Sequence, residues 1–151
     1  MAQDSAVEQT GIYLDSSALA KLYVPEPESD RLDSFLRGRR DLVMSELAIT
    51  EVLSAVARKR REGILSASQA FEIRDAILAD AGSGSFNRLD LGPLVHREAE
   101  RLLFNVESVA LRTLDALHVA LALQASATYI VTYDARMGAA ALHAGLKVVE
   151  P

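Results

Sequence analysis

The chain has 151 residues, which suits one domain with one core, and half of them are hydrophobic although only 5% are aromatic. The absence of Cys excludes disulfides, thiolate zinc sites and cysteine nucleophiles. The net charge of −5 argues against a non-specific nucleic-acid coat, but it does not exclude a nuclease, because a carboxylate site contributes negative charge of its own.

The first ten residues differ in character from the rest of the chain. They are polar and contain no basic region followed by an apolar stretch, so we expect a disordered segment at 1–10 without a secretory signal, followed by one domain over 11–151. No apolar run in the sequence reaches membrane-spanning length. We therefore expect a soluble, cytoplasmic protein.

The first predicted elements are a strand, an acid and a helix in succession. Residues 11–15 are a short apolar run that ends at Asp15. The helix that follows over 18–23 is expected to be capped by Ser16 or Ser17 and to be stopped by the prolines after it. This arrangement places an acid at the carboxyl end of a strand.

The remaining predicted elements are also helices and short strands. Helices are predicted where apolar residues recur at helical spacing, at 28–38, 45–63, 66–82, 93–106, 113–127 and 136–145. Strands are predicted at the short apolar runs 41–45, 86–91, 129–134 and 147–150. Strands that alternate with helices indicate a mainly parallel sheet of about five strands covered on both faces, which is a three-layer α/β/α sandwich.

Four acidic residues stand where such a fold can place an active site. Asp15 and Asp134 follow predicted strands, and ligands bind beyond the carboxyl ends of the strands in open α/β sheets. Glu51 shares a helix face with small or apolar residues, and Asp115 lies near the start of an apolar helix. Taken singly, a strand-end Asp is more often a turn or capping residue, and Asp115 can equally be a favourable acid in the first turn of its helix.

Convergence of these acids would require a cation. Two carboxylates about 4 Å apart repel each other by ~4 kcal/mol at an effective dielectric constant of about 20, so a cluster of them needs positive charge. Carboxylate oxygens and water are the ligands of Mg²⁺ or Mn²⁺, and such ions can activate water and orient a phosphodiester. If the acids meet, the sequence therefore predicts a metal-dependent site.

Four segments of the chain resemble one known family. They are IYLDSSALAKLYVPEP, SELAITEVLSAVAR, TLDALHVALAL and the ending YIVTYDARMGAAALHAGLKVVEP. Their order and content resemble PIN domains, and among these the VapC toxins of toxin–antitoxin pairs. The resemblance covers residues 11–151. It implies a PIN-like fold, a Mg²⁺- or Mn²⁺-dependent ribonuclease, a VapB-type antitoxin that inhibits it, and a homodimer.

The resemblance also implies roles for residues at matching positions. Metal ligation and catalysis would belong to Asp15, Glu51, Asp115 and Asp134, with RNA hydrolysed by a metal-activated water. Ser16 and Thr132 match hydroxyls that are expected to hold carboxylates or water. Position 136 is Arg where some relatives carry a further acid, so the choice between one metal ion and two stays open.

Two other polar residues near the acids admit two interpretations each. Arg112 precedes the helix of Asp115 and is a candidate contact for an RNA phosphate, although capping or simple exposure is equally consistent. His118 lies one turn after Asp115. We favour a structural role for it over a general base, because a metal-activated water needs less help from an imidazole.

Other functions compete with the ribonuclease. An aspartyl phosphatase needs a second acid where residue 17 is Ser, and a phospho-accepting receiver needs its principal Asp later in the chain. Two alternatives stay open: a non-catalytic PIN module that binds RNA or protein, and an RNA-processing nuclease without an antitoxin. Metal-dependent cleavage that is lost in Asp15→Asn distinguishes an enzyme from a binding module.

Overall fold

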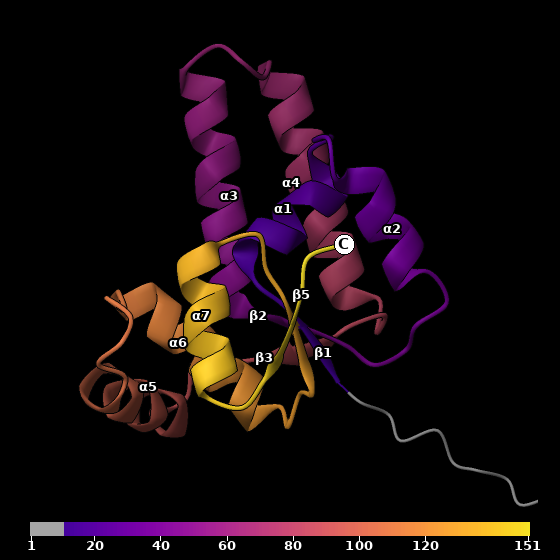
Figure 1. The fold of residues 1–151 in the computed structure, drawn as a ribbon. Coiled ribbons are helices and arrows are strands. Elements are labelled where there is room, and N and C mark those ends of the chain that lie inside the picture. Colours follow the sequence, from indigo (N-terminus) through magenta and orange to yellow (C-terminus); the bar gives the residue numbers. More distant parts are fainter. Residues whose placement is uncertain (1–10) are drawn as a thin grey trace, which may run out of the picture.

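Residues 11–151 are described by a computed structural model, and the segment predicted to be disordered at 1–10 lies outside them. Within the described residues there are five strands and seven helices (Figure 1). The strands are β1 (Ile12–Leu14), β2 (Leu42–Ser45), β3 (Asn87–Leu89), β4 (Tyr129–Val131) and β5 (Lys147–Val149). The helices are α1 (Ser16–Tyr23), α2 (Ser29–Leu36), α3 (Glu46–Arg61), α4 (Ala67–Gly82), α5 (Pro93–Asn105), α6 (Thr113–Gln124) and α7 (Ala135–His143). Every predicted element is present, most of them with shorter bounds.

The strands form one sheet in the order β3-β2-β1-β4-β5, and all neighbouring pairs are parallel. β1 lies at the centre, where Tyr13 pairs with Val43 of β2 and with Ile130 of β4. The chain builds the sheet outward from β1 to β3 and then returns to β4 on the other side of β1. Such a reversal leaves a crevice beyond the carboxyl ends of the two strands where the order reverses, which are β1 and β4. The predicted parallel sheet is confirmed.

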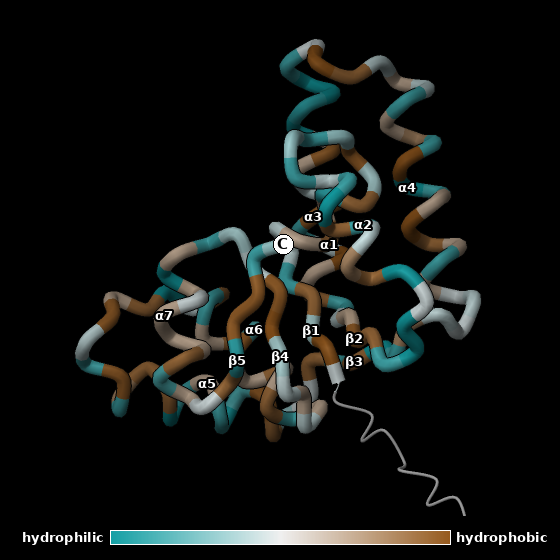
Figure 2. Tube along the Cα trace, turned by 45° about the vertical axis from the view of Figure 1, so that its right-hand side comes forward, coloured by the Kyte–Doolittle hydropathy of each residue, from teal (hydrophilic) through white to brown (hydrophobic). Residues whose placement is uncertain are grey.

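Helices cover both faces of the sheet. Side chains alternate along β1, so that Tyr13 packs with α5, α6 and α7, whereas Ile12 and Leu14 pack with α1 and α2. Figure 2 shows hydrophobic residues concentrated along the strands between these helical layers. The three-layer α/β/α sandwich expected from the sequence is therefore confirmed.

Helices α3 and α4 lie side by side and extend beyond the sheet (Figure 1). They pack together through Val52, Val56, Ala70 and Ile77. Ser66 starts α4 with a capping box, in which its side chain and that of Gln69 each accept from a backbone N–H of the other residue. The N-terminal half of α3 is the part nearest the sheet and carries Glu51. None of the helices within residues 11–151 is long and apolar enough to span a membrane.

Candidate active site

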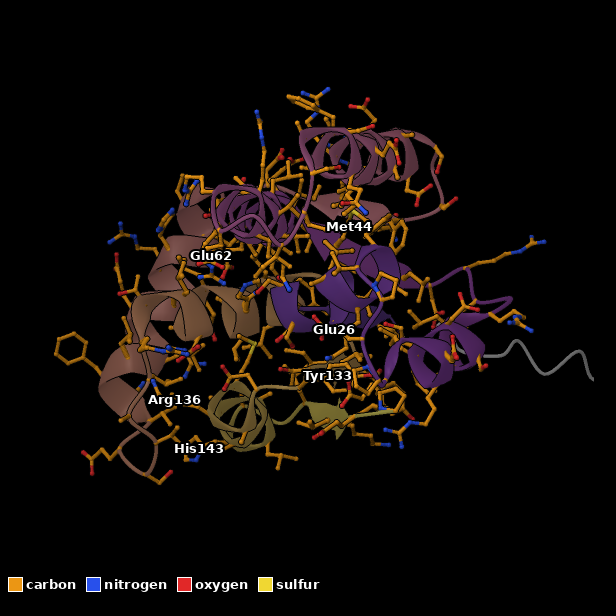
Figure 3. The ribbon with its side chains drawn as sticks, turned by 90° about the horizontal axis from the view of Figure 1, so that it is seen from above. Glu26, Met44, Glu62, Tyr133, Arg136 and His143 are labelled. Atoms are coloured by element: carbon orange, nitrogen blue, oxygen red, sulfur yellow. The ribbon has the colours of Figure 1, made fainter. Side chains whose placement is uncertain are left out.

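A cavity of about 360 Å³ lies at the edge of the sheet where β1 and β4 end. Its lining includes all four predicted acids, Asp15, Glu51, Asp115 and Asp134. Two of them follow β1 and β4, and the other two come from α3 and α6, so residues far apart in the sequence meet here. Figure 3 views the molecule from this edge, with Tyr133, the neighbour of Asp134, near the middle.

Asp15 is the most buried of these acids, with 1% of its surface exposed. Its carboxylate accepts hydrogen bonds from the backbone N–H of Ala18 at 2.9 Å and from the hydroxyls of Ser17 at 2.7 Å and Thr132 at 2.5 Å. Burial raises the pKa of Asp15 and outweighs these donors, which lower it. A divalent cation would oppose the effect of burial, because nearby positive charge favours the carboxylate form.

The start of α1 differs from the prediction. The cap is Asp15 rather than Ser16 or Ser17, because β1 ends at Leu14 and leaves Asp15 extended just before the first helical turn. Ser17 instead donates to Asp15, a contact that the sequence analysis missed. The hydroxyl of Ser16, which was expected to hold a carboxylate, lies 3.4 Å from Glu51.

Thr132 connects the two acids that follow strands. Its hydroxyl donates to Asp15 and accepts from the backbone N–H of Asp134 at 3.1 Å. We predict that Thr132→Val lowers the free energy of unfolding by ~1–3 kcal/mol, because a buried carboxylate loses a donor. Urea unfolding measures this change, with Thr50→Val on the exposed surface of α3 as the control. Equal midpoints for the two variants would contradict the prediction.

Arg112 bridges the other two aspartates. Its guanidinium donates to Asp115 at 3.2 and 3.3 Å and to Asp134 at 3.3 Å. Asp115 also accepts from the backbone N–H of Arg112 at 3.1 Å, as a first-turn acid does. Asp134 caps α7 with Oδ1 while its Oδ2 faces Arg112. The capping roles considered from the sequence are therefore present, and they do not prevent the acids from sharing a cavity.

Glu51 contacts His118, for which the sequence favoured a structural role. Oε1 of Glu51 lies 2.5 Å from Nε2 of His118, and Nδ1 of His118 lies 2.7 Å from the hydroxyl of Tyr13. Both residues belong to the cavity lining, where His118 is fully buried and Glu51 is partly exposed. The spacing of one helical turn from Asp115 was the only signal in the sequence that His118 lies near the site.

The carboxylates do not form a closed metal cage. Across residues 11–151, no three His, Cys, Asp or Glu side chains lie close enough together to hold an ion. Mg²⁺, however, is usually bound through one or two carboxylates and keeps several waters. Asp115 and Asp134 already share one positive group, the guanidinium of Arg112. The carboxylate oxygens that line the cavity are the ligand type of Mg²⁺ or Mn²⁺, and two of these carboxylates already pair with a positive charge. The residues present therefore fit such an ion.

Comparison with known proteins agrees with the resemblance of the four sequence segments. Residues 12–142 match the PIN domain family. The chain is 39% identical over 143 residues to Ribonuclease VapC46 of Mycobacterium tuberculosis, an alignment that covers 93% of this chain and 97% of the relative.

Solved structures show the same fold. VapC20 of Mycobacterium tuberculosis, described as a sarcin-ricin loop cleaving toxin, matches with a TM-score of 0.71 at 16% identity over 93% of this chain and 100% of the other. A chain of a toxin–antitoxin complex from Klebsiella pneumoniae matches with a TM-score of 0.64 at 16% identity over 93% of this chain and 98% of the other. The protein therefore belongs to the PIN domain family, with the VapC ribonucleases among its relatives.

Proposed function

We propose that this protein is a VapC-type ribonuclease toxin that hydrolyses RNA with Mg²⁺ or Mn²⁺ and is inhibited by a VapB-type antitoxin. The observation that carries the proposal is the convergence of four acids from separate elements on one cavity. Carboxylates gather in this way where a cation offsets their mutual repulsion. The relative Ribonuclease VapC46 supports RNA as the substrate.

We assign metal binding and catalysis to Asp15, Glu51, Asp115 and Asp134. A divalent ion, when bound, supplies positive charge and an activated water for phosphodiester hydrolysis. Three donors fix the Asp15 carboxylate before any ligand arrives, which supports Asp15 as a direct ligand. Thr132 is one of those donors, and Ser16 faces Glu51 from the cavity lining.

Arg112 is the proposed RNA contact at this cavity. Its side chain is 61% exposed, although its guanidinium pairs with buried Asp115. A guanidinium binds a phosphate in the same forked manner as a carboxylate. If Asp115 and Asp134 held a cation instead of this guanidinium, Arg112 would be available to pair with a phosphodiester at the same cavity.

The relatives also suggest partners. Because a similar structure is described as a toxin–antitoxin complex, we propose that this chain binds a VapB-type antitoxin. We further propose that residues 11–151 form one PIN domain and that the protein is a homodimer. Light scattering of the free protein and of its antitoxin complex tests the assembly, and a monomeric mass in both would contradict the dimer.

Metal removal tests the proposed activity. Purified, antitoxin-free protein is incubated with labelled total RNA in Mg²⁺, in Mn²⁺ or in EDTA. We expect discrete fragments with either ion, none in EDTA, and recovery when Mn²⁺ is added back in excess. Asp80→Asn is a matched control, because Asp80 is an acid that binds Tyr23 away from the cavity, and it should cleave like the wild type.

Intact RNA in this experiment would contradict the proposed function. If folded, antitoxin-free protein leaves RNA intact with both ions, the ribonuclease proposal fails. A non-catalytic binding module would then be the better description of the same fold.

A further inference from the structure

A buried chain of hydrogen bonds reaches the cavity from the core. It runs from Ser45 through Tyr13 and His118 to Glu51. The Tyr13 hydroxyl lies 2.9 Å from Oγ of Ser45 and 2.7 Å from Nδ1 of His118, and Nε2 of His118 lies 2.5 Å from Oε1 of Glu51. Ser45, Tyr13 and His118 are all completely buried. His118 and Glu51 belong to the cavity lining, and of the four residues only Glu51 is partly exposed.

The hydrogen atoms of this chain can be assigned in one direction. The Glu51 carboxylate only accepts, so Nε2 of His118 must carry a hydrogen, and in the neutral imidazole Nδ1 then accepts. Tyr13 therefore donates to His118, and burial raises the pKa of Tyr13, which keeps its hydroxyl protonated. Ser45 then donates to Tyr13, while its oxygen accepts from the backbone N–H of Ala48 at 3.0 Å.

The chain also closes a ring between three elements of the fold. Ser45, the last residue of β2, caps α3, and Glu51 lies within α3, so both ends of the hydrogen-bond chain are tied to the same helix. Tyr13 comes from β1 and His118 from α6. Since His118 follows Asp115 by one turn of α6, the ring holds α3 against the helix that carries another proposed ligand.

We propose that His118 is a positioning residue for Glu51. It holds Oε1 of the carboxylate, so that Oε2 is directed toward the cavity, where Ser16 lies 3.4 Å away. The Glu51 side chain is 26% exposed and has rotatable bonds that could carry it into solvent. The imidazole removes that freedom. The catalytic consequence rests on the proposed function, whereas the orientation of Glu51 does not.

Gln and Asn at position 118 each retain one half of the imidazole's hydrogen bonding. The amide nitrogen of Gln can take the place of Nε2 and donate to Glu51. The shorter Asn can accept from Tyr13 at the place of Nδ1, but it does not reach Glu51. Both variants disturb a fully buried position, so both should lower stability. Only His118→Asn removes the donor to Glu51.

Kinetics of the two variants test the proposal. We expect kcat for RNA cleavage to fall about tenfold or more in His118→Asn, with little change in KM, and to stay near wild type in His118→Gln. Urea midpoints should fall in both. In a Glu51→Gln background, His118→Asn should have no further effect on kcat. Equal kcat values for the two folded variants would overturn the proposal, because a purely structural histidine affects activity only through stability.

A second measurement needs neither metal nor RNA. ¹⁵N NMR of the His118 imidazole in EDTA reports which ring nitrogen carries the hydrogen, and we expect the Nε2–H form in the wild type. The Nδ1–H form would overturn the proposal whatever the protein does to RNA. The Nε2–H form in a wild type that cleaves no RNA would support the positioning of Glu51 and refute only the proposed function.

Discussion

Asp15→Asn should leave the protein folded and lower RNA cleavage by about 100-fold or more. Asn caps helices about as well as Asp, so the start of α1 is retained. The variant lacks the negative charge that a divalent cation requires at this position. Loss of a group that merely supports a metal ligand typically costs about 10–100-fold, and loss of a ligand should cost more. Cleavage of labelled RNA with Mg²⁺ or Mn²⁺ measures the effect.

The stability of the same variant separates a lost ligand from a damaged fold. Because burial raises the pKa of Asp15 in the folded state, its contribution to stability is fully present below the unfolded pKa of about 3.9. That contribution is lost as pH rises through the folded pKa. In EDTA, the wild type should therefore lose stability relative to Asp15→Asn as the pH rises above about 4 and through the raised folded-state pKa.

Urea unfolding at several pH values checks this expectation. Added Mn²⁺ should stabilise the wild type more than the variant, since only the wild type retains the charged ligand. Asp80→Asn again serves as the control acid outside the cavity. An Asp15→Asn protein that is folded and cleaves RNA at the wild-type rate would refute the assignment of Asp15 to the catalytic site.

Arg112→Gln should have two effects of opposite sign. Without RNA, Mn²⁺ should bind more tightly, because the guanidinium no longer competes for Asp115 and Asp134. The gain should be modest, since the side chain is 61% exposed and water screens its ion pairs. With RNA, kcat/KM should fall by roughly 10–100-fold, because a charge-assisted contact to phosphate is lost.

Calorimetry with Mn²⁺ and RNA binding at several salt concentrations measure the two effects. The slope of log K against log salt should become shallower by about 0.7, the value for one contact to a single-stranded phosphate. Arg136→Gln is the matched control. Arg136 contacts Asp134 through its backbone N–H, which the substitution retains, whereas the ion pair of Asp134 is with Arg112. Figure 3 places Arg136 toward the periphery. Weaker metal binding in Arg112→Gln, or equal effects in both variants, would contradict the interpretation.

The fold was largely predictable because its signals are local. Apolar runs such as 129–131 and the helical spacing in α3 and α5 depend only on neighbouring residues, and they indicated the correct elements. The helix predicted over 93–106 does begin at residue 93, where a proline suits the first helical turn. The cap of α1 was wrong because Asp15 and Ser16 are comparable caps, and only the end of β1 decides between them.

The site was predictable as a set of acids but not as a network. The strand-end positions of Asp15 and Asp134 follow from the order of elements. The partners of His118 lie 67 and 105 residues away in the chain, so no local pattern connects them. The bridge from Arg112 to Asp134, 22 residues apart, likewise depends on how α6 and α7 pack. Such contacts are set by tertiary structure.

The pairing of β1 with β4 has a consequence for the time at which the site can form. Asp15 is synthesised well before Thr132, its hydrogen-bond donor, which lies 117 residues later in the chain. The two acids that follow strands can meet only after β4 has been made and has inserted beside β1. Contacts between such distant residues form late, because a long loop must close first. A partly folded chain in which β4 is still unpaired therefore lacks the assembled site of the proposed ribonuclease.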